Sequence, residues 1–253
     1  MLKYFGKCLI VESGKKKILV VGDLHLGYEE FLNRSGIFVS RIMFDEMIQY
    51  FDRFFAEIGN VNEIVLLGDV KHEFGSIIKQ EKDDSAKLFD YLGKKCEKII
   101  VIKGNHDKIL EPLVRNRKKI LLRDYFIEGK FCFLHGDKNF NENSKNSRAL
   151  ASYKASSLEI FDKKVEFIIM GHWHPAVRLS EGAKSEKYKC FLEAKLGRKN
   201  IIILPSFSEY SEGTDPRDTS IGKIWGLDVE KFKVKIVADN FKVLDFGILK
   251  KFN

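Results

Sequence analysis

The residues that could do chemistry stand at the ends of short apolar runs. Five polar segments close such runs, and together they contain all six histidines of the chain. A single histidine beside a strand is usually a core or surface residue, but six of them at such positions indicate a common site. Ligand sites in open α/β sheets are built at the carboxyl ends of the strands, so we expect the segments to converge on one cleft. The segments are VVGDLHLG with Asp23 and His25, LLGDVKHEFG with Asp69 and His72, IKGNHDK with Asn105 and His106, FLHGDK with His135, and MGHWHPAV with His172 and His174.

The donor types in these segments favour transition metals. Two aspartates, one asparagine and four of the histidines are too many ligands for one ion. Imidazole mixed with carboxylate suits manganese, iron or zinc better than magnesium or calcium. Two ions that share a ligand would use the whole set. In D-x-H and G-H-x-H, alternate side chains of an extended strand end point to the same side, which predicts Asp23 beside His25 and His172 beside His174.

The elements that must position these residues can be read from the apolar pattern. Helical spacing predicts a helix over residues 41–59 that ends at Gly59, and further helices over 84–95 and 147–164. Strands that alternate with helices imply right-handed crossovers and a parallel sheet buried on both faces. The buried strands predicted at the polar segments are KILVVGD, EIVLLGD, KIIVIKGN and EFIIMGH.

The later part of the chain has a different pattern. Residues 125–137 and 187–205 predict hairpins, and therefore a second sheet of mixed direction. No proline-rich linker and no internal repeat divides the sequence. We therefore expect one domain over residues 1–253, with two sheets flanked by helices and no separate capping domain.

Composition narrows the class of protein. With 253 residues, 44% of them hydrophobic, the chain can bury a sizeable core. No apolar run reaches the length of a membrane span, and the N-terminus lacks the features of a signal peptide, so we expect a soluble, cytoplasmic protein with no membrane partner. The cysteines form no CxxC pair, which disfavours a zinc knot or a disulfide framework. Packing roles are predicted for Cys8, Cys96, Cys132 and Cys190.

The formal net charge is +8, and lysine contributes more of it than arginine. Basic clusters stand at residues 15–17, 94–95 and 115–119. A basic surface attracts polyanions through electrostatic steering and counterion release. A lysine- and glutamate-rich chain whose solvated faces tip positive would show the same balance. The charge therefore supports a nucleic-acid partner without establishing one.

The ordered set D-x-H, G-D-x-x-H, G-N-H-D, H-G-D and G-H-x-H resembles the motifs of the calcineurin-like metallophosphoesterases. The resemblance implies an α/β fold, a four-layer α/β/β/α sandwich with two mixed sheets flanked by helices, and a dinuclear site. His106 matches the catalytic histidine of the family, placed near the leaving or non-bridging phosphate oxygen. Carried over by position, one metal would be held by Asp23, His25 and His174, the other by Asn105, His135 and His172, and Asp69 would bridge them.

His72 departs from the protein-phosphatase branch of the family, where an aspartate pairs with the catalytic histidine. A histidine here is similar to the SbcD-type DNA-repair nucleases and their archaeal relatives. The segments GDLHLGYEE and LPSFSEYSEG also resemble archaeal phosphoesterases related to SbcD. The resemblance implies a second catalytic role for His72, as a hydrogen-bond partner of His106 or of the substrate.

The implied activity is that of a dinuclear metal-dependent phosphoesterase in which a metal-bridging hydroxide attacks phosphorus in line. His72 and the basic charge favour a phosphodiesterase or nuclease acting on nucleic acid. A small-molecule phosphodiesterase or phosphomonoesterase is the alternative, and a non-enzymatic scaffold is a third possibility. Two divalent transition-metal ions are expected, manganese first, with iron, zinc or nickel as alternatives. The sequence indicates no substrate-binding residue, protein partner or oligomeric state.

Residues beside the motifs carry weaker expectations. Asp107 is expected to orient a backbone turn rather than bind metal. Trp173 is expected to pack over its own loop rather than stack on a base. Tyr28, Glu29 and Arg34 would either line the cleft or simply begin a helix.

Overall fold

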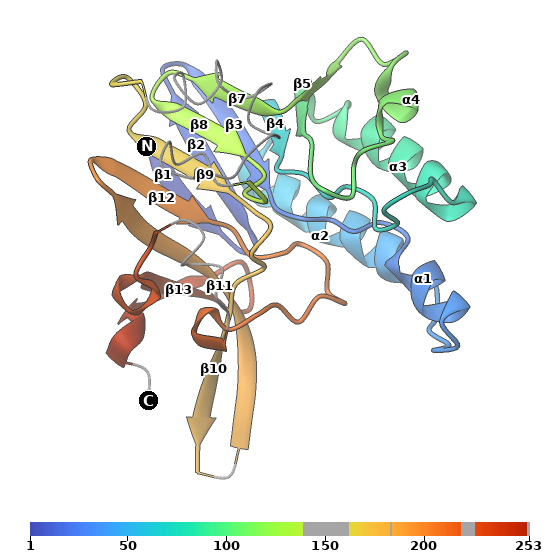
Figure 1. Cartoon of the computed structure of the whole chain (residues 1–253). Coiled ribbons are helices and arrows are strands. Elements are labelled where there is room, and N and C mark those ends of the chain that lie inside the picture. Colours follow the sequence, from blue (N-terminus) through green and yellow to red (C-terminus); the bar gives the residue numbers. More distant parts are fainter. Residues whose placement is uncertain (139–161, 183, 219–225, 252–253) are drawn as a thin grey trace.

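Two β-sheets face each other in the computed structural model, which describes residues 1–138, 162–182, 184–218 and 226–251 (Figure 1). The first sheet has the strand order β1–β2–β3–β4–β5–β6. The second has the order β14–β13–β11–β12–β9–β8–β7, with β10 paired to β11. Both are mixed, since each contains parallel and antiparallel pairs. The architecture of two mixed sheets flanked by helices, predicted from the sequence, is confirmed.

The first sheet is built from the apolar runs predicted to be buried strands. Its four strands from β3 to β6 are parallel neighbours, whereas β1 and β2 continue it by antiparallel pairing. The strands are β1 (Leu2–Phe5), β2 (Cys8–Ser13), β3 (Lys16–Val21), β4 (Val61–Leu66), β5 (Cys96–Ile102) and β6 (Ile120–Arg123).

Helices cover the outer face of the first sheet (Figure 1). The predicted helix over 41–59 is confirmed as α2, which ends before Gly59. The helix predicted over 84–95 begins earlier, because the Glu81 carboxylate accepts a hydrogen bond from the backbone amide of Ile78 at 3.0 Å and caps a polar first turn that has no apolar periodicity. The helices are α1 (Tyr28–Arg34), α2 (Met43–Ile58), α3 (Lys79–Leu92) and α4 (Glu111–Val114).

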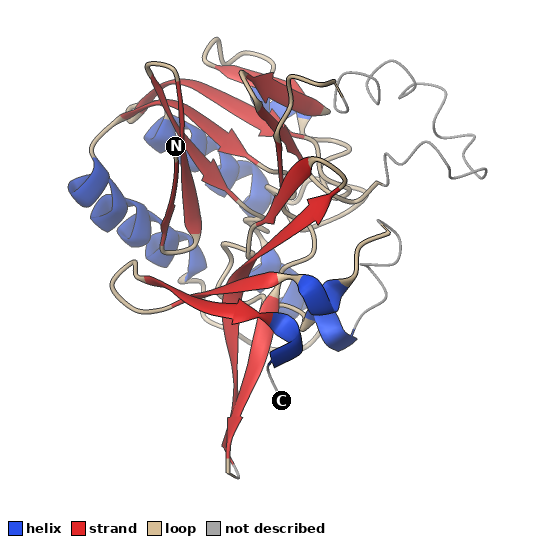
Figure 2. Ribbon diagram, turned by 90° about the vertical axis from the view of Figure 1, so that its left-hand side faces the viewer, coloured by secondary structure: helices blue, strands red, loops and turns tan. Residues whose placement is uncertain are grey.

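The second sheet contains both predicted hairpins, which are confirmed as β7–β8 and β11–β12. Parallel pairing of β9 with β8 and with β12 makes it mixed. The long hairpin β10–β11 extends away from the body of the molecule (Figure 2). The strands are β7 (Tyr125–Glu128), β8 (Phe131–Leu134), β9 (Phe167–Met170), β10 (Ala176–Glu181), β11 (Lys184–Leu196), β12 (Lys199–Ile203), β13 (Lys233–Val237) and β14 (Val243–Ile248).

One predicted helix falls mostly outside the residues that the structure describes. The helix predicted over 147–164 lies outside the described residues up to residue 161, and residues 162–164 form a bend and turn. In the described part of the chain, short 3₁₀ helices pack on the outer face of the second sheet, at Val229–Lys231 and Leu249–Lys251.

Three apolar layers hold the sheets and helices together. One lies between the first sheet and α2 and α3, one between the two sheets, and one on the outer face of the second sheet. Trp173 belongs to the outermost layer, where its ring stacks on Phe232 with centroids 6.0 Å apart, so it packs in the core as predicted, but against a residue distant in sequence rather than over its own loop. The four cysteines are free and buried, which confirms the packing roles predicted for them.

No helix among the described residues is both long enough and apolar enough to cross a membrane.

The layer between the sheets should contribute strongly to stability. Phe133 is fully buried there, so Phe133→Ala should lower the free energy of unfolding by about 3–5 kcal/mol, since it removes a large side chain and leaves a cavity. Leu244→Ala, at a side chain that is 47% exposed on β14, should change it by less than about 1 kcal/mol. The measurement is denaturant unfolding of both variants, and similar losses would show that Phe133 does not contribute to stability as a core residue.

Candidate metal centre

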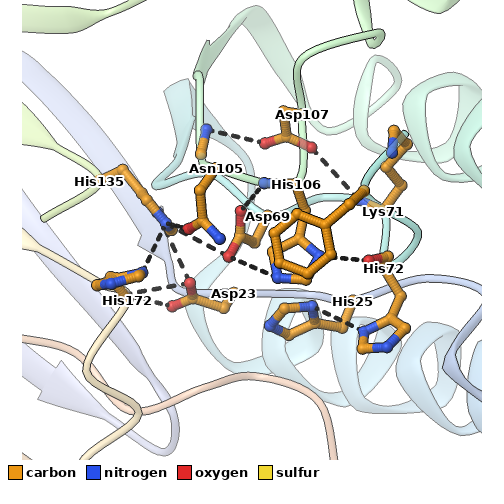
Figure 3. A network of polar contacts seen from close by, with 12 residues as sticks. Asp23, His25, Asp69, Lys71, His72, Asn105, His106, Asp107, His135 and His172 are labelled. Carbon is orange, nitrogen blue, oxygen red and sulfur yellow. Dashed lines mark hydrogen bonds and ion pairs between the residues drawn. The ribbon is translucent and has the colours of Figure 1, made fainter. Parts of the chain in front are cut away.

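The residues predicted to do chemistry all lie just past the carboxyl ends of five strands. β3, β4 and β5 are parallel neighbours in the first sheet, and β8 and β9 are parallel neighbours in the second. The turns that follow these strands bring both predicted aspartates and the surrounding imidazoles into one network (Figure 3). Residues far apart in the sequence therefore meet where the two sheets present the same edge.

One group consists of Asp23, His25 and His174, whose potential ligand atoms all lie within 4.8 Å of one another. His174 Nε2 is 3.3 Å from Asp23 Oδ1. The Nε2 atoms of His25 and His174 are also 3.3 Å apart. These are the residues predicted to hold one of the two metals.

A second group consists of Asp69, His135 and His172, within the same 4.8 Å limit. His135 Nε2 is 3.3 Å from Asp69 Oδ2 and 3.1 Å from His172 Nδ1. The side-chain oxygen of Asn105 lies 3.0 Å from the same His135 nitrogen. The structure thus brings together the residues predicted to hold the second metal, including the aspartate predicted to bridge.

His135 connects the two groups. Its Nδ1 donates to the carbonyl of Leu67 at 2.7 Å, which leaves Nε2 to face the ligands of the second group. The same ring lies 3.7 Å from Asp23 Oδ1. Burial by itself lowers the pKa of His135, but the hydrogen bond to Asp69 and the charge of Asp23 outweigh it and raise the pKa to about 10. The position between the two carboxylates therefore favours positive charge.

The donor set fits divalent cations. Burial by itself raises the pKa of Asp23, but the charges of His174 and His135 hold it below its usual range. Burial lowers the pKa of His25 to about 3, so this ring is a neutral ligand type. The Nε2 atoms of His25 and His174 face each other. If one of them carries a proton, it can donate to the lone pair of the other, but only a bound cation would accept the lone pairs of both nitrogens. Carboxylate with imidazole is the donor mixture that manganese, iron and zinc share.

Four of these residues have a backbone conformation that L-residues rarely adopt. His25, Asp69, His172 and His174 have φ angles of 48°, 47°, 65° and 45°, and they are four of the six non-glycine residues with positive φ in the described ranges. Such conformations cost on the order of 1–3 kcal/mol each and cluster at functional sites. The local backbone is therefore strained where the predicted ligands stand.

The ligand residues converge for a different reason from the one predicted. The alternation of an extended strand was predicted to place Asp23 beside His25 and His172 beside His174. The strands end earlier, at Val21 in β3, and the histidines are left-handed rather than extended. The ligand atoms do meet, but through tight turns rather than through strand alternation.

Glycines make room for the two carboxylates. A Cβ atom on Gly104 would lie 2.1 Å from Asp69 Oδ1, and one on Gly171 would lie 2.5 Å from Asp23 Oδ2. Neither distance is compatible with a side chain. The glycines of G-N-H-D and G-H-x-H are thus required by the close approach of an aspartate from a neighbouring turn.

His106 is fixed beside the second group. Its backbone N–H donates to Asp69 Oδ1 at 2.9 Å, and its ring Nδ1 contacts the backbone carbonyl of His72. Its Nε2 lies 3.8 Å from Asp69 Oδ2. The predicted link between His106 and His72 therefore runs through the backbone of His72 and not between the two rings.

The ring of His72 lies against the first group instead. Its Nδ1 is 3.3 Å from Nδ1 of His25. Burial and the nearby His106 lower the pKa of His72 to about 4. His25, His72 and His106 also form a third set of nitrogens close enough to hold a metal ion. His72 is thus in contact with both a predicted ligand and the predicted catalytic residue.

Asp107 holds the turn that carries Asn105 and His106. Its buried carboxylate accepts hydrogen bonds at 3.1 Å from the backbone amides of Val70 and Gly104, which confirms its predicted role in orienting a turn. Burial and the charge of Asp69 raise its pKa to about 7. It joins the turn after β4 to the turn after β5.

The three residues noted after the D-x-H motif have different roles. Glu29 is buried, and its Oε1 accepts the backbone amides of Ile42 and Met43 at 2.7 Å each, so it caps α2. Arg34 pairs with Glu30 on the surface of α1. Tyr28 does line the site.

A sequence profile described as calcineurin-like phosphoesterase matches residues 16–177. The chain belongs to the calcineurin-like phosphoesterase family. Membership supports hydrolysis of phosphoesters as its activity, and members of the family typically bind two divalent metals. The two ligand groups of this calcineurin-like phosphoesterase lie at positions suited to such a pair.

Solved structures are similar to this chain at low sequence identity. The nuclease MPE of Pseudomonas putida is 15% identical, with a TM-score of 0.58 over 94% of this chain and 100% of the other. A structure described as a novel archaeal phosphodiesterase is 14% identical, with a TM-score of 0.40 over 91% of this chain and 99% of the other. Vps29 of Entamoeba histolytica in complex with zinc is 15% identical, with a TM-score of 0.35 over 91% and 99%. A search of curated proteins found no match.

A cavity of about 260 Å³ opens beside the ligand groups of this calcineurin-like phosphoesterase. Among the described residues, its walls are imidazole, phenol and hydroxyl groups, without a lysine or arginine. A cavity of this size and polarity can receive a phosphate ester next to the predicted metals. The lining residues are His25, Tyr28, His72, His106, His174, Ser208 and Ser211.

Sequence reasoning missed Ser211 and the lysines that hold its loop. Ser211 Oγ lies 3.1 Å from His174 Nδ1, on the opposite side of the ring from the ligand nitrogen. The buried Lys7 donates to the carbonyl of Phe207 at 2.8 Å, and Lys189 donates to the carbonyls of Ser206 and Ser208. Ser211 lies in the segment LPSFSEYSEG, but no local pattern shows that Lys7 and Lys189, both distant in sequence, hold this segment.

The contact of Ser211 with His174 should tune metal binding. Ser211→Ala removes the acceptor that fixes the orientation of the His174 ring, so we expect manganese affinity to fall by about 10- to 100-fold. Ser180→Ala is the control, because its hydroxyl contacts only Ser185 in the β10–β11 hairpin among the hydrogen bonds described. Manganese titration by calorimetry measures both variants, and wild-type affinity in Ser211→Ala would show that this hydroxyl does not support the ligand.

Proposed function

We propose that this phosphoesterase is a dinuclear metal-dependent phosphodiesterase or nuclease that acts on nucleic acid, related to the SbcD-type enzymes and their archaeal relatives. One observation carries the proposal. Two groups, each of one buried carboxylate and two imidazoles, are joined at His135, which lies 3.3 Å from Asp69 and 3.7 Å from Asp23.

The proposed ligands follow these groups. Manganese is the metal proposed first, and the mixed imidazole and carboxylate donors of both groups suit iron and zinc as well. When bound, two divalent ions would supply the charge that polarises a phosphate and lowers the pKa of water. One ion would be held by Asp23, His25 and His174, the other by Asn105, His135 and His172, and Asp69 would contact both.

His106 is the proposed catalytic residue. Its Nδ1 contacts the carbonyl of His72, so the hydrogen bond turns Nε2 toward Asp69 and the cavity. A proton on Nε2 would then stand where a non-bridging phosphate oxygen or a leaving alkoxide is expected. The hydrogen bond from the His106 amide to Asp69 keeps this nitrogen in a fixed position relative to the proposed ligands.

The preference for diesters is assigned to His72. A carboxylate beside His106 would favour a cationic imidazole, which suits a dianionic monoester. The imidazole at position 72 adds no negative charge to the cavity and leaves room for a monoanionic diester. The net charge of +8 supports a nucleic acid as the source of that diester.

The ratio of diester to monoester activity tests the proposed function. For the wild-type protein loaded with manganese, kcat/KM should be higher for bis-p-nitrophenyl phosphate than for p-nitrophenyl phosphate. His72→Asp should shrink the ratio by about 1–3 kcal/mol in relative transition-state stabilisation. His72→Asn removes the imidazole without adding charge and separates the two effects. A wild-type ratio below one would contradict the phosphodiesterase assignment, and an unchanged ratio in His72→Asp would remove His72 from the explanation.

His106 and the ligands should respond differently to substitution. His106→Ala should keep a manganese content near that of the wild type while turnover falls by about 10²- to 10⁴-fold, the usual contribution of a positioned acid or base. His172→Ala should lose metal and activity together, because its ring nitrogen belongs to the second group. Metal analysis after desalting and assays with bis-p-nitrophenyl phosphate measure both. Equal loss of metal in the two variants would make His106 a ligand.

A further inference from the structure

Large aromatic side chains are exposed next to the candidate site. Phe74 is 52% exposed and Phe31 is 41% exposed, although exposed phenylalanine is unfavourable in water. Phe74 follows the turn that carries Asp69 and His72, and Phe31 lies on α1, which follows the turn of Asp23 and His25. Both aromatic side chains therefore come from segments that also supply site residues.

The rings lie against the histidines of the cavity. The ring centroid of Phe74 is 3.6 Å from that of His106, at an angle of 33°. The ring of Phe31 is 4.8 Å from that of His72. Tyr28, whose side chain lines the cavity, is 4.5 Å from the His72 ring and nearly parallel to Phe31, at 14°. The three aromatic rings border the place where a phosphate ester is expected.

The turn that carries Phe74 is held firmly. Glu81 is fully buried. Its Oε1 accepts hydrogen bonds from the backbone amides of His72, at 3.0 Å, and Glu73, at 2.6 Å. The same carboxylate accepts the amide of Ile78 through its other oxygen. The backbone is thus held directly before Phe74 and again four residues after it, which limits the entropy lost when a ligand stacks on this ring.

We infer that Phe31 and Phe74, with Tyr28, form a stacking surface for the bases that flank the scissile phosphate, so that the substrate is a single-stranded or unpaired stretch of nucleic acid. The inference rests on the proposed phosphodiesterase function and specifies its substrate. It requires unpaired bases, because the faces of bases inside a duplex are already stacked on their neighbours.

Chemistry favours a nucleobase as the occupant. Every base has a π-face, so stacking on phenylalanine tolerates any sequence, while the phosphate enters the cavity next to it. Exposed lysines stand close by in the sequence, Lys79 at the start of α3 and Lys108 just past His106, and each adds positive charge to a segment next to the site residues. The net charge of +8 complements a polyanion rather than an apolar protein surface.

The test compares dinucleotides with and without bases. The substrates are thymidylyl-thymidine and an analogue in which both bases are replaced by hydrogen, each with one phosphodiester bond. Loss of the bases should lower wild-type kcat/KM by about 5- to 150-fold, the value of stacking one base. Phe74→Leu and Phe31→Leu should lower kcat/KM for the normal dinucleotide within the same range, mainly through KM, and leave the analogue within about 3-fold of the wild type.

Phe38→Leu is the matched control. Phe38 is 88% exposed in the loop after α1, and within the described ranges it has no ring contact with the site histidines. It should behave as the wild type does on both substrates. A labelled single strand should also be cut faster than the same strand in a blunt duplex.

Several outcomes would overturn the inference without touching the proposed function. Equal cleavage of both dinucleotides by the wild type would exclude base stacking. Equal losses on both substrates in Phe74→Leu would show that this ring acts only on His106. A loss in Phe38→Leu as large as in Phe31→Leu would point to a general apolar surface, such as one for a protein. Failure of the wild type to cleave bis-p-nitrophenyl phosphate as well would instead refute the proposed function.

Discussion

The structure depends on the burial of two carboxylates in one place. Asp23 and Asp69 are almost completely buried, and each buried anion costs several kcal/mol unless positive charge and hydrogen bonds compensate it. His135 lies between them, and the two carboxylates raise the pKa of its ring. A proton on this ring in turn stabilises both negative charges. The remaining imidazoles present nitrogen lone pairs to the same space. A pair of divalent cations is the charge that such an arrangement accommodates best.

The fold around this site serves to hold like charges close together. Carboxylates from two turns can approach only because Gly104 and Gly171 have no side chains, and strained backbone at Asp69 and three of the histidines aims the donors inward. Asp107 ties the turns after β4 and β5 to each other. Lys7 and Lys189 then hold the loop that supports His174. Strain and buried charge at the centre are thus offset by hydrogen bonds in the surrounding turns and by the three apolar layers behind them.

Much of this could be predicted from the sequence because the information is local. Apolar runs ending in glycine and a ligand residue predicted the buried strands, and residue types predicted the donor groups. The cause of the convergence could not be predicted, since a left-handed φ is uncommon even for histidine and no local pattern marks His25 or His174 as adopting it. The early start of α3 depends on the Glu81 carboxylate, and the roles of Ser211 and Phe74 depend on contacts with residues distant in sequence. Pairings of that kind are set by the tertiary structure, not by a pattern along the chain.

The central claim is that Asp69 joins two metal sites into one centre. Manganese-loaded protein, freed of excess metal, can be analysed for metal content and by electron paramagnetic resonance. The account predicts two manganese ions per chain that are magnetically coupled, and loss of that coupling in Asp69→Ala. A single ion per chain, or two ions in the wild type without coupling, would contradict it.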